Sequence, residues 1–269
     1  MFKRVKNPFL RYLLFVIYFS IILFCAIELN FLWLFGHTPD MDDIKHPALS
    51  ISSELYTADG KLMGRYYKED RSPVDFKGIS PNLIHAIIAT EDNRFYKHGG
   101  VDFIGFVSSM ISTARGDKRG GSTITQQLAK NMFKTRSDKS QGLVKYIPVV
   151  RTVVYKIKEW ITAFKIEHNY TKEQILTMYF NTVPFGYNSF GIKTATRRYF
   201  NKNPDKITAP EAATLIGMLK ATSTYNPVRN PEKSMQRRNV VLSQMARLNF
   251  ISQKEYKEYA AKKIKLNLG

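Results

Sequence analysis

The longest apolar run of the chain covers residues 12–35, close to the N-terminus. As an α-helix it would be about 36 Å long, enough to cross a hydrocarbon core of roughly 30 Å. The pattern predicts a transmembrane helix, with Glu28 and Asn30 near the far end, where a charge can reach the interface. A cleaved signal peptide is the alternative, but the run is too long and no small-residue cleavage site follows cleanly.

Charges on either side of this run predict its orientation. Residues 1–11 contain four basic residues and no acid, whereas Asp40, Asp42 and Asp43 follow the run. The positive-inside tendency therefore places residues 1–11 in the cytoplasm and most of the chain outside. Residues 36–52, with two prolines and no clear period, are expected to form a linker.

The outer domain begins with a predicted β-hairpin. Segments 53–57 and 61–67 flank Asp59-Gly60, a pair suited to the positive φ angles of a tight turn. We expect the hairpin to lie near the membrane and to be structural.

Helical signals dominate the rest of the chain. Pro148 opens a long pattern with an apolar row, and Thr171, Thr208 and Ser252 each precede Gln or Glu by three residues, as in a capping box. The predicted fold class is mainly α, with one small hairpin.

A further apolar stripe begins at Phe103 and recurs at helical spacing to Ile111. Most such stripes belong to a core. The alternative is that this one enters the bilayer surface beside Arg115, Lys118 and Arg119.

The charge composition indicates which kind of molecule the protein binds. The formal net charge is +19, which suggests an anionic partner. A domain outside the membrane with no aromatic-basic motif argues against nucleic acid, so a lipid-borne phosphate is the leading candidate. Cys25 is the only cysteine, which excludes an internal disulfide and a cysteine-based metal site.

The stretch from Ala89 to His98 carries the candidate acid. It follows a helical pattern opened by Ser80, and its apolar row ends at Glu91. A carboxylate there loses water, which favours its protonated form, so it could accept a proton near neutral pH. The alternative is an exposed acid at a helix end.

Two further stretches contain residues suited to binding an anion. Residues 120–131 predict a glycine-rich loop entering a helix, where free N–H groups and Lys130 would favour a phosphate, although the P-loop signature is missing. Lys156 and Glu159 lie at i, i+3 spacing with Lys158 nearby; the usual explanation is a surface ion pair.

Five stretches together resemble the peptidoglycan glycosyltransferases, a lysozyme-like family, in the order of that family and over about residues 53–260. They are Glu91-Asp-x-x-Phe95-x-x-His98, the run from Gly120 to Asn131, Lys156-x-Lys158-Glu159, Lys172 to Asn181, and Glu211-Ala-Ala through Tyr225-Asn-Pro227.

The resemblance implies a glycosyltransferase domain over residues 53–265, held outside a bacterial inner membrane. Its reaction would polymerise lipid II into β-1,4 glycan in a single inverting step, releasing undecaprenyl pyrophosphate. Glu91 would be the general base, and Glu159 would orient the lysines or hold a divalent ion. Substrate-binding roles would fall to Ser122, Thr123, Gln126, Gln127, Lys130, Asn131, Lys156, Lys158, Phe95 and His98. Among these, Phe95 and His98 are expected to shape the site rather than react, and Asn181 to support the fold.

The resemblance also bears on cofactors and partners. No cofactor is required, although a divalent cation, Mg or Mn, assists some members. The implied partners are lipid II, the growing glycan chain, the membrane and other proteins of cell-wall synthesis.

Three positions depart from the family pattern, since Tyr155 stands in place of Arg, Ser108 in place of a basic residue and Thr177 in place of Glu. The missing charge could come from Lys156, Lys158, Arg136 or Arg151. The closest likeness is to the module of bifunctional penicillin-binding proteins. Because Ser-x-x-Lys and Lys-Thr-Gly are both missing, we expect either a monofunctional enzyme or, preferably, the front part of a longer protein.

Two rival functions remain open from the sequence. A lysozyme-like hydrolase would cleave the same glycan, but it has no use for several lysines around a pyrophosphate. A non-catalytic, membrane-tethered binder of anionic cell-wall polymers would explain the charge, but not an acid that closes an apolar row.

Overall fold

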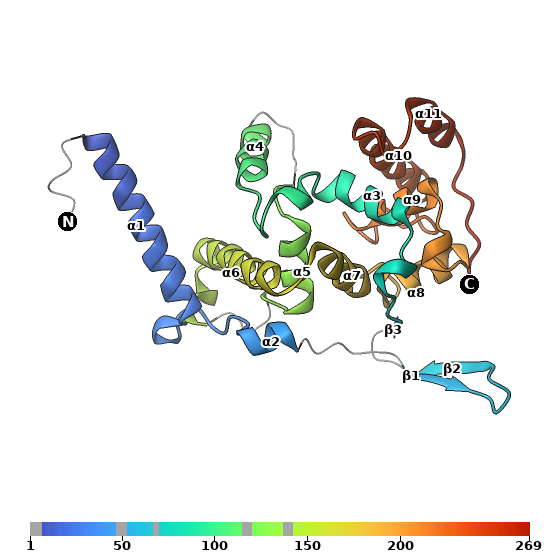
Figure 1. The fold of residues 1–269 in the computed structure, drawn as a ribbon, viewed down its shortest axis with the longest axis horizontal. Coiled ribbons are helices and arrows are strands. Elements are labelled where there is room, and N and C mark those ends of the chain that lie inside the picture. Colours follow the sequence, from blue (N-terminus) through green and yellow to red (C-terminus); the bar gives the residue numbers. More distant parts are fainter. Residues whose placement is uncertain (1–6, 47–52, 67–69, 115–119, 137–141) are drawn as a thin grey trace.

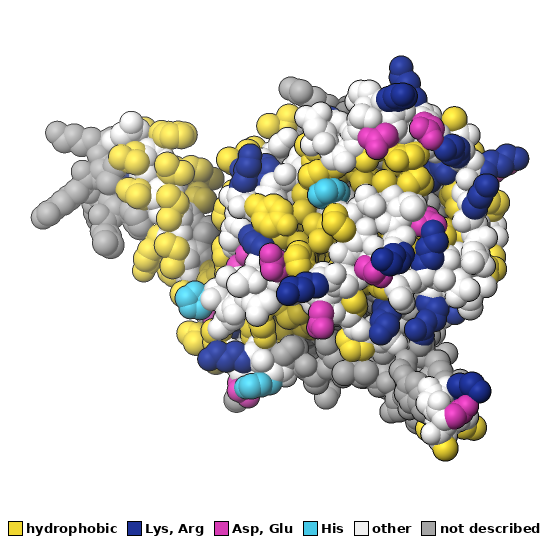
Figure 2. All heavy atoms as spheres, turned by 45° about the vertical axis from the view of Figure 1, so that its right-hand side comes forward, with side chains coloured by type: hydrophobic (Ala, Val, Ile, Leu, Met, Phe, Trp, Pro, Cys, Tyr) yellow, Lys and Arg dark blue, Asp and Glu magenta, His cyan; other side chains and the backbone are white. Residues whose placement is uncertain are grey.

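The N-terminal helix of the computed structural model stands apart from a helical domain (Figure 1), and the structure describes residues 7–46, 53–66, 70–114, 120–136 and 142–269. This helix, α1, runs from Pro8 to Glu28, and Asn7 caps it. It is long and apolar enough to cross a membrane. Figure 2 shows its apolar side chains exposed on an arm that projects from the domain.

The predicted end of this helix, at residue 35, is wrong. Helix α1 ends at Glu28, and Asn30 adopts a left-handed conformation with φ of 47°. The Asn30 side-chain oxygen accepts hydrogen bonds from the N–H groups of Phe35 and Gly36. This side chain stabilises a turn containing the short 3-10 helix Phe31–Trp33, which the hydrophobic pattern did not indicate.

The segment predicted as a linker contains a helix, α2, from Met41 to Lys45. Its capping box joins Asp40 and Asp43, so two of the acids that follow the apolar run act as caps. Residues 47–52 of the predicted linker, like basic residues 3–6, lie outside the described residues.

The hairpin is confirmed. Strand β1, Ser53–Tyr56, pairs antiparallel with β2, Leu62–Tyr66, around the Asp59-Gly60 turn. Figure 1 places it at the end of the molecule remote from α1. A second pairing, not predicted, joins β3, Asp70–Arg71, in parallel with β4, Ser189–Phe190.

Helices make up the body of the domain, as predicted. They are α3 Pro81–Glu91, α4 Phe103–Ala114, α5 Ile124–Met132, α6 Pro148–Asn169, α7 Lys172–Thr182, α8 Ile192–Phe200, α9 Ala209–Met218, α10 Pro231–Arg247 and α11 Gln253–Ala261. Capping boxes at Thr171, Thr208 and Ser252 open α7, α9 and α11, as the sequence predicts.

The main core joins these helices into one apolar cluster. Helix α3 packs on α9 and α10, whereas α5 packs on α6 and α7, so residues at the end of α3 and along α5 and α6 are held on a common scaffold. Asn181 supports this arrangement through hydrogen bonds to both the N–H and the carbonyl of Val74.

Helix α4 is not part of the core, so the more common explanation of its stripe is wrong. None of its residues is buried, and the apolar side chains that are exposed are Phe103, Ile104, Val107, Met110 and Ile111. Its only aromatic support in the described chain comes from Trp160 of α6, whose ring meets Phe103 and Phe106 edge-on. The neighbouring residues 115–119 lie outside the described chain.

A second, small apolar cluster joins α1 to α6. Ile27 of α1 is buried against Val154 and Ile161, and Leu23 and Val144 pack on the same cluster. The C-terminal end of α1 is therefore fixed to the domain by packing, in agreement with their proximity in Figure 1.

Candidate active site

Glu91 is the last residue of α3 and is half-buried. Its Oε2 accepts a hydrogen bond from the side-chain Nε2 of Gln127, at 2.8 Å. The Oε1 of Gln127 in turn accepts from the hydroxyl of Tyr179, at 3.0 Å. Burial, and then the charge of Glu91, raise the pKa of Tyr179 well above its usual value, so this hydroxyl remains protonated and donates.

Lys156 of α6 lies at the centre of a second polar cluster. Its ammonium donates to Ser122 Oγ at 2.7 Å, to Gln126 Oε1 at 3.1 Å and to Glu159 Oε2 at 2.9 Å. Three protons therefore serve three acceptors, and the side chain is still 30% exposed. The lysine links α6 to the glycine-rich segment and the start of α5.

Glu159 is not a surface residue, because its side chain is only 2% exposed. Its Oε2 accepts from Lys156, and its Oε1 accepts from the Nε and Nη2 of Arg136, each at 2.8 Å. The guanidinium of Arg136 also lies 5.9 Å from the centre of the Tyr155 ring. Of the four candidates for the missing charge, Arg136 is thus the one that lies over position 155 and pairs with Glu159.

This donor set does not fit a divalent ion. Each Glu159 oxygen is already paired with a cation, and no three His, Cys, Asp or Glu residues gather into a ligand group within the described chain. Mg²⁺ and Mn²⁺ need several oxygen ligands, and a carboxylate neutralised by lysine and arginine is a poor one.

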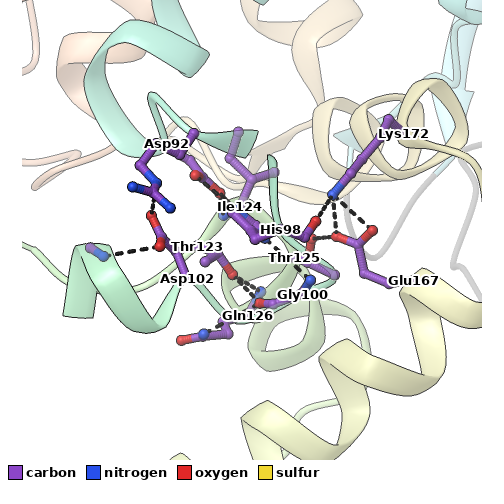
Figure 3. Close-up of polar contacts among 12 residues, drawn as sticks. Asp92, His98, Gly100, Asp102, Thr123, Ile124, Thr125, Gln126, Glu167 and Lys172 are labelled. Carbon is purple, nitrogen blue, oxygen red and sulfur yellow. Dashed lines mark hydrogen bonds and ion pairs between the residues drawn. The ribbon is translucent and has the colours of Figure 1, made fainter. Parts of the chain in front are cut away.

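Asp92 and His98 form a buried pair next to the start of α5, drawn in Figure 3. His98 Nε2 lies 3.0 Å from both Asp92 oxygens, and its Nδ1 accepts from the N–H of Gly100. The ring proton of the neutral histidine is therefore on Nε2, facing Asp92. Both side chains are buried, so His98 holds the loop and does not face solvent.

The start of α5 is already occupied, contrary to the expectation that its N–H groups are free for an anion. The N–H of Ile124 donates to Asp92 Oδ2 at 3.0 Å, and the N–H of Gln126 donates to the capping Thr123 Oγ1. Thr123 is itself buried and donates to the carbonyl of Gly100 at 2.6 Å. The protein's own carboxylate takes the place of an external anion at this helix end.

A further network, not anticipated from the sequence, fixes the other side of the loop (Figure 3). Glu167 Oε1 accepts from Thr125 and from Lys172, and Lys172 also donates to the carbonyl of His98. The Lys172 ammonium lies 4.4 Å from the ring centre of Phe95, which is fully buried. One available signal was the position of Glu167 two helical turns after Glu159, on the same side of α6.

Lys130 and Asn131 complete the exposed side of α5. Lys130 is exposed and Asn131 is half-buried. They follow Gln127 by three and four residues, so the helix presents them on the side where Gln127 meets Glu91. The acid and this lysine therefore share one side of the scaffold.

Lys158 has a different position from the other predicted site residues. Its side chain is completely buried, and its ammonium donates to the carbonyls of Gly36 at 3.0 Å and His37 at 2.8 Å. Burial lowers its pKa to about 8. It binds the segment after α1, away from the Lys156 cluster.

The structure thus brings Glu91, Gln127, Lys130 and Asn131 to one region and Ser122, Gln126, Lys156 and Glu159 to the adjoining one. Two of the predicted site residues, Thr123 and Phe95, are buried, and the side chain of His98 is only 5% exposed. Lys158 lies apart and binds the segment after α1. Sequence reasoning did not anticipate the Tyr179–Gln127 contact or the Glu167–Lys172 pair. A separate cavity of about 350 Å³ lies on α10 and α11, lined in part by Asn239, Ser243, Arg247 and Tyr256, and includes none of these residues.

Taken together, the fold and the site define a mainly helical domain that follows an apolar N-terminal helix and carries a carboxylate and lysines on neighbouring helices. The chain belongs to the transglycosylase family, because the family model described as Transglycosylase matches residues 59–246.

Named relatives are consistent with this family. Penicillin-binding protein 1A of Escherichia coli K12 is 37% identical over 262 residues, covering 94% of this chain and 29% of that protein. Penicillin-binding protein 1F of Bacillus subtilis 168 is 36% identical, covering 95% of this chain and 34% of that protein. The chain thus spans about a third or less of the relatives' length.

The crystal structure of penicillin-binding protein 1A from Haemophilus influenzae aligns with 82% of this chain and 22% of that one, at 25% identity and a TM-score of 0.46. These relatives and the apolar N-terminal helix fit a single-pass protein of the inner membrane.

Proposed function

We propose that this protein polymerises lipid II into β-1,4 glycan strands and releases undecaprenyl pyrophosphate, with Glu91 as the general base. The observation that carries the proposal is the hydrogen bond from Gln127 to Glu91, because it holds the acid beside the face of α5 that presents Lys130. A carboxylate next to a cation is suited to couple deprotonation of an acceptor with departure of an anionic group.

The acceptor is a sugar 4-hydroxyl, a poor nucleophile. Its proton passes to Glu91 as its oxygen forms a bond to the anomeric carbon of the donor. The bond from that carbon to the diphosphate breaks, and its electron pair leaves with the diphosphate. One displacement inverts an α-linked donor into a β linkage without a covalent enzyme intermediate.

The leaving diphosphate needs charge compensation more than it needs a proton. Lys130 is exposed and available for this role. Lys156 is partly exposed and holds three neutral or anionic acceptors of the protein, so it can exchange one of them for a phosphate oxygen. Glu159 holds Lys156 and Arg136 in place.

The buried residues take supporting roles in this proposal. The start of α5 is fixed by Asp92, His98 and Thr123. Phe95 is buried beside the Lys172 ammonium. Lys158 acts at the junction with the membrane helix and has no direct contact with substrate.

Lipid contact explains the exposed stripe of α4. Burying five large apolar side chains in the bilayer surface removes them from water, at roughly 25 cal/mol for each Å². Together with α1, the stripe would bring the site to the surface from which a lipid-linked donor arrives. In this orientation residues 1–11 are cytoplasmic and the domain is extracytoplasmic.

The test is polymerisation of lipid II by the purified chain in detergent. Glu91→Gln keeps the size of the side chain and removes the base, so we expect the rate to fall about 10²- to 10⁴-fold. Glu232→Gln, at an exposed position on α10, is the matched control and should retain the parental rate. Parental activity in Glu91→Gln would show that Glu91 is not the base.

A parallel assay with finished peptidoglycan separates the rival functions. Release of sugar fragments without synthesis from lipid II would indicate a hydrolase. Binding of anionic polymer without turnover, unaffected by Glu91→Gln, would indicate a binding protein.

A further inference from the structure

Tyr179, Gln127 and Glu91 are joined by two hydrogen bonds that end at the proposed base. Tyr179 is 1% exposed and lies on α7, whereas Gln127 lies on α5 and Glu91 ends α3. Three helices therefore contribute one residue each to a single hydrogen-bonded row, with links of 3.0 Å and 2.8 Å.

The chemistry of the three groups allows one arrangement when Glu91 is ionised. An ionised carboxylate only accepts, so Gln127 must present its NH₂ group to Glu91. The amide oxygen then faces Tyr179, whose hydroxyl must donate. Without that hydroxyl the amide could turn over and present its oxygen to the carboxylate, which is repulsive unless the carboxyl carries a proton.

The row also leaves one oxygen of Glu91 for the substrate. Gln127 is the only hydrogen-bond partner of Glu91 in the described chain, and it binds Oε2. The other oxygen, Oε1, belongs to a half-buried side chain and remains available to an acceptor hydroxyl.

We propose that Tyr179 is a positioning residue for the reaction, which fixes the Gln127 amide so that its NH₂ group binds Glu91 Oε2 and leaves Oε1 to the acceptor. This inference rests on the proposed function. Tyr179 acts on Glu91 only through Gln127, and it does not itself touch the substrate.

The experiment is a double-mutant cycle in the lipid II assay. Tyr179→Phe keeps the ring in the core and removes the hydroxyl, whereas Gln127→Met keeps the length of the side chain and removes the amide. We expect Tyr179→Phe to lower kcat about five- to ten-fold, the size of one net hydrogen bond, with KM within about two-fold. In the Gln127→Met background the Tyr179→Phe change should have no further effect.

Tyr199→Phe is the matched control. Tyr199 is also buried, and its hydroxyl donates to the carbonyl of Phe185, in a contact that does not involve Glu91. Its loss should lower thermal stability without lowering kcat at a temperature where the variant is folded. Equal effects of the two tyrosine variants on kcat, or additive losses in the double-mutant cycle, would overturn the proposal.

A measurement without catalysis separates this inference from the proposed function. With ¹³C-labelled glutamate, the carboxyl signal of Glu91, identified by its loss in Glu91→Gln, should move in Tyr179→Phe and stay in place in Tyr199→Phe. An unmoved signal would show that Tyr179 does not position the Gln127 amide at Glu91, even if Glu91 is the base. A moved signal together with full activity of Glu91→Gln would support the effect of Tyr179 on Glu91 but would show that Glu91 is not the base.

Discussion

Lys156 and Glu159, one turn apart on α6, form an ion pair of 2.9 Å in which the carboxylate is almost entirely buried. A second cation, Arg136, binds the other oxygen of the same carboxylate. Glu159 therefore accounts for the position of two positive charges that face the glycine-rich segment and the Tyr155 ring.

Replacement of Glu159 by Gln should cost both stability and activity. Removing one member of a fully buried pair costs about 3–5 kcal/mol, but Lys156 and Arg136 are part-exposed and can rehydrate, so we expect about 1–3 kcal/mol. Urea unfolding in detergent measures the loss. Glu258→Gln, which breaks an exposed pair with Lys262, should change stability by less than about 1 kcal/mol.

Replacement of Lys130 by Ala should weaken use of the donor while the fold is retained. The side chain is exposed and makes no hydrogen bond or ion pair within the described chain, whereas a charge-assisted hydrogen bond to a diphosphate is worth about 1.5–3 kcal/mol. We expect kcat/KM for lipid II to fall at least about ten-fold, with an unchanged unfolding midpoint. Lys257→Ala on α11 should behave like the parent, and unchanged kinetics in Lys130→Ala would remove this lysine from the diphosphate site.

The buried Lys158 predicts a specific dependence of stability on pH. Its pKa is lowered from 10.5 to about 8, so between these values the unfolded chain holds a proton that the folded chain has lost. The free energy of unfolding should therefore rise with pH in this window, relative to a Lys158→Met variant. Urea titrations at several pH values from 7.5 to 10.5 measure this difference, for which Lys257→Met is the exposed control. A constant difference between parent and Lys158→Met would contradict the prediction.

Contact of α4 with lipid can be tested with a spin label. The chain has one cysteine, Cys25, so Val107→Cys in a Cys25→Ser background gives a single labelling site on the exposed stripe. In bilayers this label should be more accessible to oxygen than to a water-soluble nickel complex, whereas a label at Glu232→Cys should show the reverse. The same accessibility pattern at both sites would place α4 in water.

Local signals in the sequence predicted most of the helices because capping depends on residues within one turn. Ser80, Thr171, Thr208 and Ser252 all open helices as expected. The apolar row that ends at Glu91 was also confirmed, with Ile87 and Ile88 buried, although the acid itself is only half-buried.

Features that depend on distant contacts were not predictable in the same way. Asp92 reaches the start of α5, 32 residues later, and Lys158 binds carbonyls more than a hundred residues earlier. The stripe of α4 has the periodicity of a core helix, and periodicity alone cannot distinguish a protein partner from lipid. The three-residue row from Tyr179 to Glu91 needs the packing of three helices before it exists.

One helix, α6, binds the segment that leaves α1 at three carbonyls. Lys158 binds those of Gly36 and His37, and Lys165 binds that of Pro39 and the carboxylate of Glu28. The helix that carries Lys156 is therefore bound directly to the C-terminal end of α1 and to the segment that follows it. In the proposed reaction this attachment would keep the site at one distance from the apolar helix, so the growing strand would move past the protein with each added unit.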